Sequence, residues 1–412
     1  MAQLWAIIIG TVLTWRLLIV LFRYIRHIAC LGHDKQRLFM KTNSYYAYVK
    51  RHMVLAPFFH ERHHREFRLS AAINVGTLPS RLQLFFLTVY YSMNVTLCVI
   101  HLPHDAERDV LAKILRNRTG VLAVVNMIPL FLFAGRNNPL IWLLGISYDT
   151  YNLLHRWLGR LVVLEALAHT LVWTVNKVQD TSWNAVAKQM VVNPTIGTGV
   201  VGSLTLILIL IQSPSIIRHA FYETFLHVHF VLGITAIVAT WMHLQNLSQQ
   251  SLLGGAIGLW AMERFYRLVM IIRNNLGRNS TQIEVSALPG DAVMVKLHIA
   301  RPWTFKPGQH IYLYIPNIGW WTSHPFSLAW SEDEHDTHNE KGLPLDTFDA
   351  LAPRKTTMSL IIRRRTGFTE DLWNKTQSAP SGTYVTNALV EGPYGEPLTL
   401  LNNSHVLLIY KS

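Results

Sequence analysis

Four histidines in two long apolar segments share one spacing, and imidazole is a common axial ligand of haem iron. His155 and His169 stand fourteen residues apart in one segment, and His229 and His243 stand fourteen residues apart in the other. Fourteen residues of α-helix turn through about 1400°, within roughly 40° of a whole number of turns, and rise about 21 Å. Each pair is therefore expected on one helix face, at two depths of a bilayer core about 30 Å thick.

The two histidine segments are expected to cross the membrane in the same direction. Residues 195–212 (TIGTGVVGSLTLILILIQ) form a further apolar span between them. With one span intervening, His155 would face His229 and His169 would face His243. An isolated histidine on an apolar helix is usually an ordinary packed side chain, but two equal pairs on parallel spans favour a functional site. The pattern predicts two bis-histidine haem sites stacked across the bilayer.

Other histidines are interpreted differently. His227 is sixteen residues from His243, which places it about 160° round the helix, so it is predicted to face away from the haem sites. Four more are interpreted as loop residues: His52, His60, His63 and His64.

The composition excludes several classes of protein. Half of the 412 residues are hydrophobic and 15% are charged, which indicates an integral membrane protein with a soluble part rather than an ordinary soluble protein. Cys30 and Cys98 are too few for a disulfide framework or a thiolate metal cluster. The net charge of +13 comes from basic residues beside apolar segments, so positive-inside topology explains it better than nucleic-acid binding.

Hydropathy predicts seven helical crossings. Ten Lys and Arg against three acidic residues between Arg23 and Arg68 place that loop in the cytoplasm. Loop 102–118 would then lie outside and carry the glycosylation-type triplet Asn117-Arg118-Thr119, and everything after about residue 275 would be cytoplasmic. The predicted spans are 4–22, 82–101, 120–135, a fourth running from His155 past His169, 195–212, 221–243 and 252–272.

From residue 281 the pattern changes to short alternating runs separated by Pro and Gly, which are typical of β-strands. Their spacing predicts a small antiparallel barrel or sandwich. Residues 331–353 are polar and acidic and are interpreted as a surface loop. The predicted strands lie in QIEVSALPG, AVMVKLHIA, QHIYLYIP, MSLIIRRR and YVTNALVEGP.

Four motifs follow the histidine segments in a fixed order: PGQHIYLYIP (307–316), HPFSLAW (324–330), RRRTGFTEDL (363–372) and EGPYGEP (391–397). Together with the histidine pairs they resemble the fungal ferric reductase transmembrane component family, relatives of the NADPH oxidases. The resemblance extends from about residue 118 to the end of the chain. It implies a multi-pass α-helical membrane bundle followed by a cytoplasmic antiparallel β-barrel of the ferredoxin-reductase type that binds FAD.

The resemblance also implies the residues that contact FAD. The HPFS motif would lie along the isoalloxazine and ribityl chain, although alone it would be an ordinary strand end with a proline. A helix expected to start at Glu370 would offer free N–H groups to the pyrophosphate; Thr369 as a plain N-cap is compatible with this, and a charged strand face would equally explain the arginines. The implied residues are His324, Pro325, Phe326, Ser327, Arg363, Gly367, Phe368 and Thr369.

The expected organisation has four parts: N-terminal spans with a basic cytoplasmic loop (1–117), a haem-binding transmembrane domain (118–275), the FAD domain (276–400) and the first strand of an NADPH-binding domain (401–412). Family members continue from that strand into a glycine-rich turn. Here Lys411 and Ser412 stand in its place, so the NADPH site is expected to be missing or incomplete and the chain to be C-terminally truncated.

The function that the resemblance implies is electron transfer from NADPH through FAD and two b-type haems to an extracellular ferric or cupric chelate. It would serve iron uptake at the plasma membrane, with membrane lipid around the helices. No chelate site can be identified, and a permease or oxidase partner stays open. The alternatives are superoxide production, a non-catalytic membrane partner, and a transporter or channel, which would contain no haem.

Overall fold

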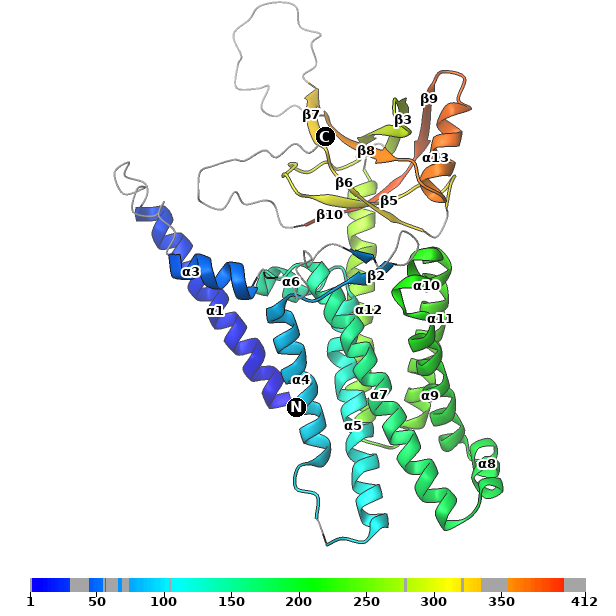
Figure 1. Ribbon diagram of the computed structural model, residues 1–412. Helices are drawn as coiled ribbons and strands as arrows, with labels where there is room; N and C mark the ends of the chain where they lie inside the picture. The colour runs from blue at the N-terminus through cyan, green and yellow to red at the C-terminus, as the bar shows by residue number, and fades with distance from the viewer. Residues whose placement is uncertain are drawn as a thin grey trace, which may run out of the picture. The chain divides into compact units, whose positions relative to one another are not determined.

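Helices fill the first part of the chain and strands the second, as Figure 1 shows for the computed structural model. The structure describes residues 2–29, 44–54, 56, 66–68, 74–103, 105–277, 280–319, 322–334 and 355–395. His60, His63, His64, Cys30, most of the predicted acidic loop and the predicted strand in 401–412 lie outside these residues. The chain divides into two compact units, Met1–Glu263 and Arg264–Ser412.

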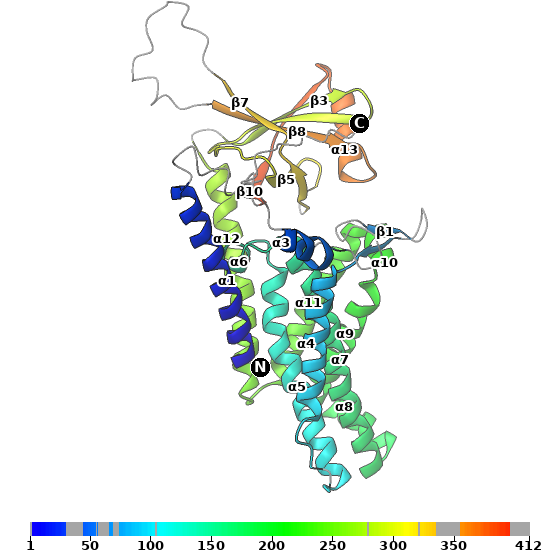
Figure 2. The same cartoon turned by 60° about the vertical axis from the view of Figure 1, so that its left-hand side comes forward.

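In the part of the first unit that the structure describes, the regular elements are helices and a two-stranded sheet of β1 (Glu66–Arg68) and β2 (Asn74–Thr77). Figures 1 and 2 show α5, α7, α9 and α11 running side by side. The helices are α1 (Ala2–Ala29), α3 (Ser44–Val49), η2 (Lys50–Val54), α4 (Arg81–Val99), α5 (Arg108–Ala134), α6 (Pro139–Leu144), α7 (Tyr148–Asp180), α8 (Trp183–Val192), α9 (Pro194–Gln212), α10 (Ser215–Ala220), α11 (Tyr222–His243) and α12 (Gln249–Asn275), whose last part belongs to the second unit.

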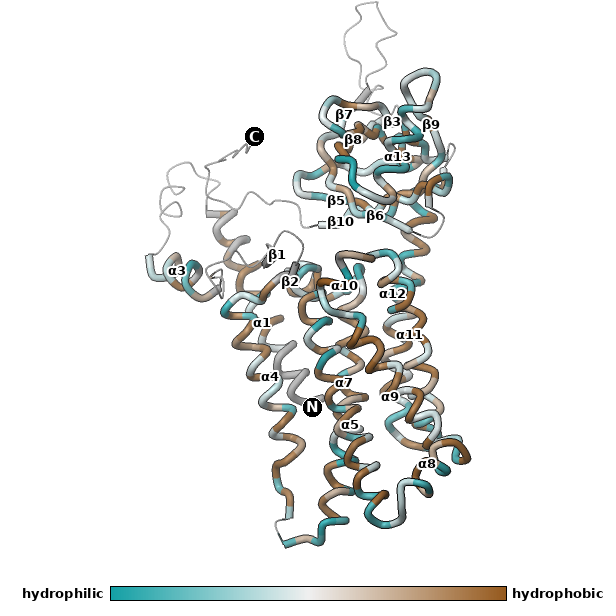
Figure 3. The backbone as a smooth tube through the Cα atoms, turned by 45° about the vertical axis from the view of Figure 1, so that its right-hand side comes forward, coloured by the Kyte–Doolittle hydropathy of each residue, from teal (hydrophilic) through white to brown (hydrophobic). Residues whose placement is uncertain are grey.

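Five helices of the described residues are long and apolar enough to cross a membrane: α4, α5, α7, α9 and α11. Hydrophobic stretches follow these helices in Figure 3. The first and last of the seven predicted spans form helices too, α1 and α12, but neither is among the five found in the described residues. In α1 the apolar stretch is the shorter Gly10–Phe22, and α12 carries Glu263, Arg264 and Arg267 in its second half.

The predicted loop at 102–118 is wrong over most of its length, because α5 already begins at Arg108. The sequence RDVLAKILRNR has no Gly or Pro and is rich in good helix formers, so it continues the apolar segment as one helix. Asn117 therefore lies within a helix rather than in an exposed loop. Thr119 is buried and its hydroxyl donates to the Leu115 carbonyl one turn back.

The charged residue that interrupts the first apolar segment, Arg16, lies at the C-terminal end of α6. A Cβ at Gly145, which follows that helix with φ +63°, would stand 2.6 Å from the Arg16 guanidinium carbon. The last carbonyls of a helix carry partial negative charge, so a cation there is favourable. This position gives Arg16 an electrostatic partner that the sequence of α1 alone did not indicate.

The second unit contains two antiparallel sheets. A five-stranded sheet has the order β7 (Trp330–Glu334), β8 (Lys355–Arg363), β4 (Ala292–His298), β3 (Gln282–Leu288) and β9 (Thr383–Asn387). A three-stranded sheet has the order β10 (Leu389–Tyr394), β5 (His310–Tyr314) and β6 (His324–Ser327). The predicted strands are confirmed, but the described strands form two sheets and not one closed barrel.

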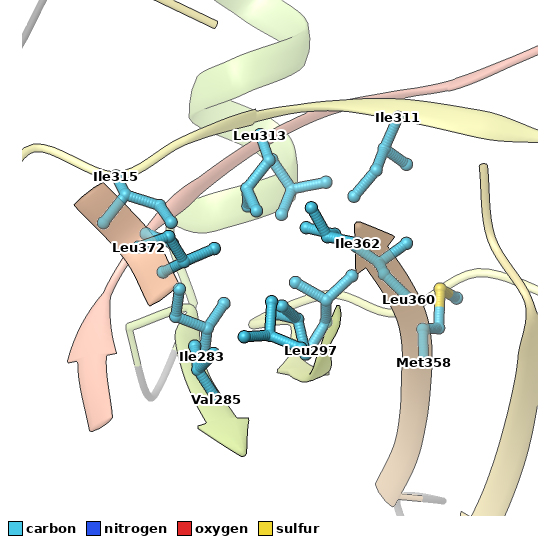
Figure 4. Packing of buried hydrophobic residues seen from close by; sticks show 14 of the residues in the cluster. Ile283, Val285, Leu297, Ile311, Leu313, Ile315, Met358, Leu360, Ile362 and Leu372 are labelled. Atoms are coloured by element: carbon cyan, nitrogen blue, oxygen red, sulfur yellow. The ribbon is translucent and has the colours of Figure 1, made fainter. Parts of the chain in front are cut away.

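Apolar side chains of the two sheets form one core, seen in Figure 4. Alternate residues of β3 and β4, such as Val285 and Leu297, are fully buried because successive side chains of a strand point to opposite faces. Phe368 and Leu372 of α13 (Phe368–Gln377) pack against the same core. The core therefore fixes the HPFS strand and α13, the two elements that the flavin prediction depends on, within one unit.

Candidate functional site

The four histidines form two facing pairs between α7 and α11. The ring centres of His155 and His229 are 6.3 Å apart, and those of His169 and His243 are 6.0 Å apart. A metal–imidazole bond is about 2 Å long and a ring centre lies ~1.1 Å from each nitrogen, so two imidazoles on one iron have centres about 6 Å apart. The structure thus brings together the predicted pairs, and the separation of the two rings in each pair leaves room for one iron between them.

Each pair offers two nitrogen ligands and no more. Among the described residues no group of three or more His, Cys, Asp or Glu is placed to hold a metal ion. Two axial nitrogens suit an iron whose remaining positions are filled by a macrocycle, as in haem. All four side chains are only half-buried, so they are not enclosed by the packing of the helices.

Three of the four imidazoles donate a hydrogen bond from Nδ1 to a backbone carbonyl on a neighbouring helix. The Nδ1 atom of His155 is 3.0 Å from the Leu130 oxygen, and that of His169 is 2.8 Å from the Arg116 oxygen. A carbonyl can only accept, so the proton resides on Nδ1 and leaves Nε2 free to bind a metal. His243 does the same toward Thr195, at 2.8 Å.

Two glycines make room for the His169–His243 pair. A Cβ at Gly120 would lie 2.6 Å from the Nδ1 atom of His169, and one at Gly199 would lie 2.7 Å from that of His243. Each imidazole therefore packs directly on the backbone of the neighbouring helix. A threonine precedes both glycines, and the Thr-Gly pairs at 119–120 and 198–199 are a repeated signal that our sequence analysis missed.

The remaining histidines do not join these pairs. His227 is exposed on α11, as predicted. His52 lies in η2 rather than in a loop, because residues 50–54 form a short π-helix.

A buried polar cluster links α4, α5 and α7 and was also missed. The Nδ2 atom of Asn126 lies 3.0 and 2.9 Å from the two carboxylate oxygens of Glu165 and 2.9 Å from the Asn94 side-chain oxygen. Tyr90 donates its hydroxyl to the Asn126 side-chain oxygen. Glu165 is 6% exposed, and an acidic residue in an apolar segment was the available signal, because burial of a carboxylate requires hydrogen-bond partners.

The second unit brings the two predicted flavin motifs into contact. The His324 ring stacks on Phe368 with centres 4.3 Å apart, and Phe326 lies 6.3 Å from the same ring. Phe368 is the first residue of α13, which begins two residues before the predicted start at Glu370. Pro325 and Ser327 are exposed on the alternate side of the HPFS strand. Strand β6 and the N-terminus of α13 are therefore neighbours.

Thr369 is not the N-cap of α13. The N-cap is Gly367, whose φ of +89° favours glycine, and it makes no side-chain cap hydrogen bond. The Thr369 hydroxyl instead bonds the backbone N–H and carbonyl of Arg365. Arg363 is exposed at the end of β8, while the side-chain hydrogen bond to Glu370 raises the pKa of Arg364. The first turn of α13 thus has exposed Arg363 nearby, but it also contains Glu370, which pairs with Arg364, and Asp371.

The EGPYG motif is anchored to the last turns of α12 within the second unit. Glu391 is completely buried and accepts hydrogen bonds from the Arg267 guanidinium and the Tyr314 hydroxyl at 2.9 and 2.8 Å. Asn275 pairs with the backbone of Val390 in both directions, each bond 2.8 Å long. The motif therefore has a structural role in this chain, which its sequence alone did not reveal.

Two family descriptions match the chain in the same places. Residues 119–240 match "Ferric reductase like transmembrane component". Residues 278–339 match "FAD-binding domain". The first match contains three of the paired histidines and the second contains the HPFS motif, with His243 just beyond the end of the first.

Named relatives agree with these descriptions. The chain is 26% identical to Ferric/cupric reductase transmembrane component 2 of Saccharomyces cerevisiae over 97% of its own length and 53% of the relative. It is 27% identical to Ferric reductase transmembrane component 3 of the same yeast, over 88% and 48%. Probable cell surface ferric reductase kap2 of Aspergillus oryzae is 32% identical, over 68% and 36%. The chain spans about half the length of the first two.

Proposed function

We propose, because this chain belongs to the ferric reductase transmembrane component family, that it transfers electrons across a membrane to a ferric or cupric chelate. The observation that carries the proposal is the pair of histidine separations, 6.3 and 6.0 Å, each of which would allow both rings of a pair to bind one iron. Relatives named ferric or ferric/cupric reductases support the choice of acceptor.

The histidines have one role in this proposal: they bind haem iron through Nε2 and fix its position. His155 and His229 would hold the inner haem, and His169 and His243 the outer one. Bound haem supplies one-electron chemistry, and the protein supplies ligation, spacing and insulation. The Nδ1 hydrogen bonds orient the rings and set their basicity as ligands.

The second unit would bind FAD, with NADPH as the electron donor. The HPFS strand would line the flavin, and the N-terminus of α13 from Gly367 to Thr369 would bind its pyrophosphate. Arg363 would add a charged phosphate contact. The contact between His324 and Phe368 supports one shared site for these segments.

We also propose a topology and a setting. In addition to the five apolar helices, α1 and α12 would cross the membrane, giving seven crossings and placing the FAD domain (276–400) in the cytoplasm. The haem domain would be 118–275. The chelate would be reduced outside the plasma membrane, as the relative named a cell surface ferric reductase suggests. This reduction would serve iron uptake.

The proposal is tested by haem content and by the reduced-minus-oxidised absorption spectrum of the purified chain. We expect two b-type haems in the wild type and one in His169→Ala, because that substitution removes a ligand of the outer iron only. His227→Ala, on the same helix as two ligands but exposed, is the control and should keep both haems. A wild-type chain that binds no haem would overturn the proposal, and equal loss of both haems in His169→Ala would contradict the pairing.

A further inference from the structure

The backbone carbonyls that accept hydrogen bonds from the histidine Nδ1 atoms are spaced like the histidines themselves. The Arg116 and Leu130 carbonyls on α5 are fourteen residues apart, matching the fourteen residues between His169 and His155. On α9 the outer carbonyl is that of Thr195. The helices α9 and α11 are antiparallel, and the two histidines of α11 are also fourteen residues apart. A step of fourteen residues along α9 from Thr195 leads to Ile209. The Ile209 carbonyl is thus the position expected for His229.

The fourth position departs from the other three. The Nδ1 atom of His229 is buried and has no hydrogen-bond partner among the described residues. The Ile209 carbonyl accepts a hydrogen bond from the Ser213 hydroxyl instead, at 2.5 Å. The residue four positions after the accepting carbonyl is Gly120, Ala134 and Gly199 at the three bonded positions and Ser213 at this one.

A carbonyl oxygen has two lone pairs, so a hydroxyl on it does not by itself exclude an imidazole. Thr119 and Thr198 donate to the Arg116 and Thr195 carbonyls, each at 3.0 Å, and the imidazoles share those carbonyls. These threonines stand three residues after the carbonyl, and the glycine at the fourth position leaves space for the ring. At Ile209 it is the fourth residue itself that carries the hydroxyl.

The end of α9 explains why a serine is stable there. The helix ends at Gln212, and the Ser213 N–H bonds the Leu210 carbonyl rather than that of Ile209. The Ile209 carbonyl therefore lacks its usual helical donor, and the Ser213 side chain satisfies it. The Ser213 hydroxyl therefore occupies the carbonyl that the fourteen-residue register assigns to the imidazole of His229.

We infer that Ser213 is a positioning residue that withholds the Ile209 carbonyl from His229 and makes the inner histidine pair asymmetric. The inference rests on the proposed function. An Nδ1 hydrogen bond makes a histidine a more basic ligand, which stabilises the oxidised iron. With one such bond instead of two, a haem iron held by the inner pair would be easier to reduce than one with two such bonds.

Reciprocal substitutions test this inference on the intact, haem-loaded chain. Ser213→Ala frees the Ile209 carbonyl and should lower the midpoint potential of the inner haem and change its low-spin electron paramagnetic resonance signal. Ala134→Ser places a hydroxyl at the equivalent position beside His155 and should raise that potential. The double variant again has one bonded ligand and should return toward the wild-type value.

The outer haem provides the internal reference, and the inner signal is assigned by its loss in His155→Ala. An unchanged inner potential and signal in Ser213→Ala, with both haems bound, would overturn the inference, as would equal shifts of both haems. Ser213→Gly, which copies the residue at 120 and 199, is the second variant if Ser213→Ala loses haem. Wild-type protein without haem would overturn the proposed function and this inference together, so the two failures are distinguishable.

Discussion

At the scale of single residues, a glycine of α5 and an imidazole of α7 are in close contact. Gly120→Ala would place a methyl group 2.6 Å from the Nδ1 atom of His169, so the ring or the helix must move. We expect the variant to lose the outer haem and keep the inner one. Gly199→Ala should do the same through His243. Haem content per chain, measured on purified protein, gives the result.

Gly233→Ala is the matched control, because no heavy atom lies within 4 Å of a Cβ at Gly233 on α11. Alanine favours a helix over glycine by about 1 kcal/mol, so this variant should keep both haems and be no less stable. Retention of two haems with unchanged spectra in Gly120→Ala would show that the outer site tolerates the methyl group.

The sequence predicted which histidines pair but not the groups that hold their rings in place. Four histidines at two equal spacings determine which rings share a helix face, since the helical repeat is known. The Arg116 and Thr195 carbonyls and the two glycines depend on the register between neighbouring helices. That register cannot be predicted from a single sequence. The repeated Thr-Gly pair is present in the sequence, but only the structure shows that its glycines lie against the imidazoles.

At the scale of elements, the last turns of α12 and strand β10 are held together by a buried ion pair. Glu391→Ala would leave the Arg267 guanidinium, whose side chain is only 14% exposed, without its carboxylate. Removing one member of a buried pair costs about 3–5 kcal/mol. We expect β10 and the end of α12 to lose protection from amide hydrogen exchange, measured by mass spectrometry on the intact chain.

Glu370→Ala is the control for this element, because it removes a carboxylate from the exposed Arg364–Glu370 pair on the same unit. Exposed pairs contribute little to stability, so hydrogen exchange in β10 should not change. Equal exchange in Glu391→Ala and wild type would mean that Asn274, Asn275 and the strand pairing hold β10 without the ion pair.

The strands were predictable because buried apolar residues such as Val285, Val295 and Leu360 alternate with other residues along the sequence. The first residues of the helices were harder to predict. α5 begins well before its apolar segment, and α13 begins at Phe368 because Gly367, with its positive φ, turns the chain into the helix. The Thr369 hydroxyl forms its hydrogen bonds with the preceding backbone at Arg365, and this partner depends on the turn conformation rather than on the residue type.

At the scale of the whole molecule, charged residues in predicted spans have partners from other elements. Among the described residues, five helices are long and apolar enough to cross a membrane, and the other two predicted spans contain Arg16 in α1 and Glu263 in α12. Their partners, the end of α6 for Arg16 and the Asn137 N–H for Glu263, come from distant parts of the chain. The Glu165 cluster has the same character, since α4, α5 and α7 each supply a member.

Whether α12 crosses the membrane determines the side on which the second unit lies, and labelling with a membrane-impermeant maleimide measures this. In a background with Cys30 and Cys98 replaced by serine, Gln245→Cys adds an exposed thiol in the turn between α11 and α12, and Ser381→Cys adds one in the second unit. With seven crossings, intact cells should label the thiol at 245 only, and permeabilised cells should label both.

Because the α4–α5 and α11–α12 connections lie at the same end of the helices in Figures 1 and 2, a cysteine at exposed His101 should behave like that at 245. Labelling of the thiol at 381 in intact cells would mean that α12 does not cross, which would place the second unit outside and remove the cytoplasmic flavin from the proposed electron path.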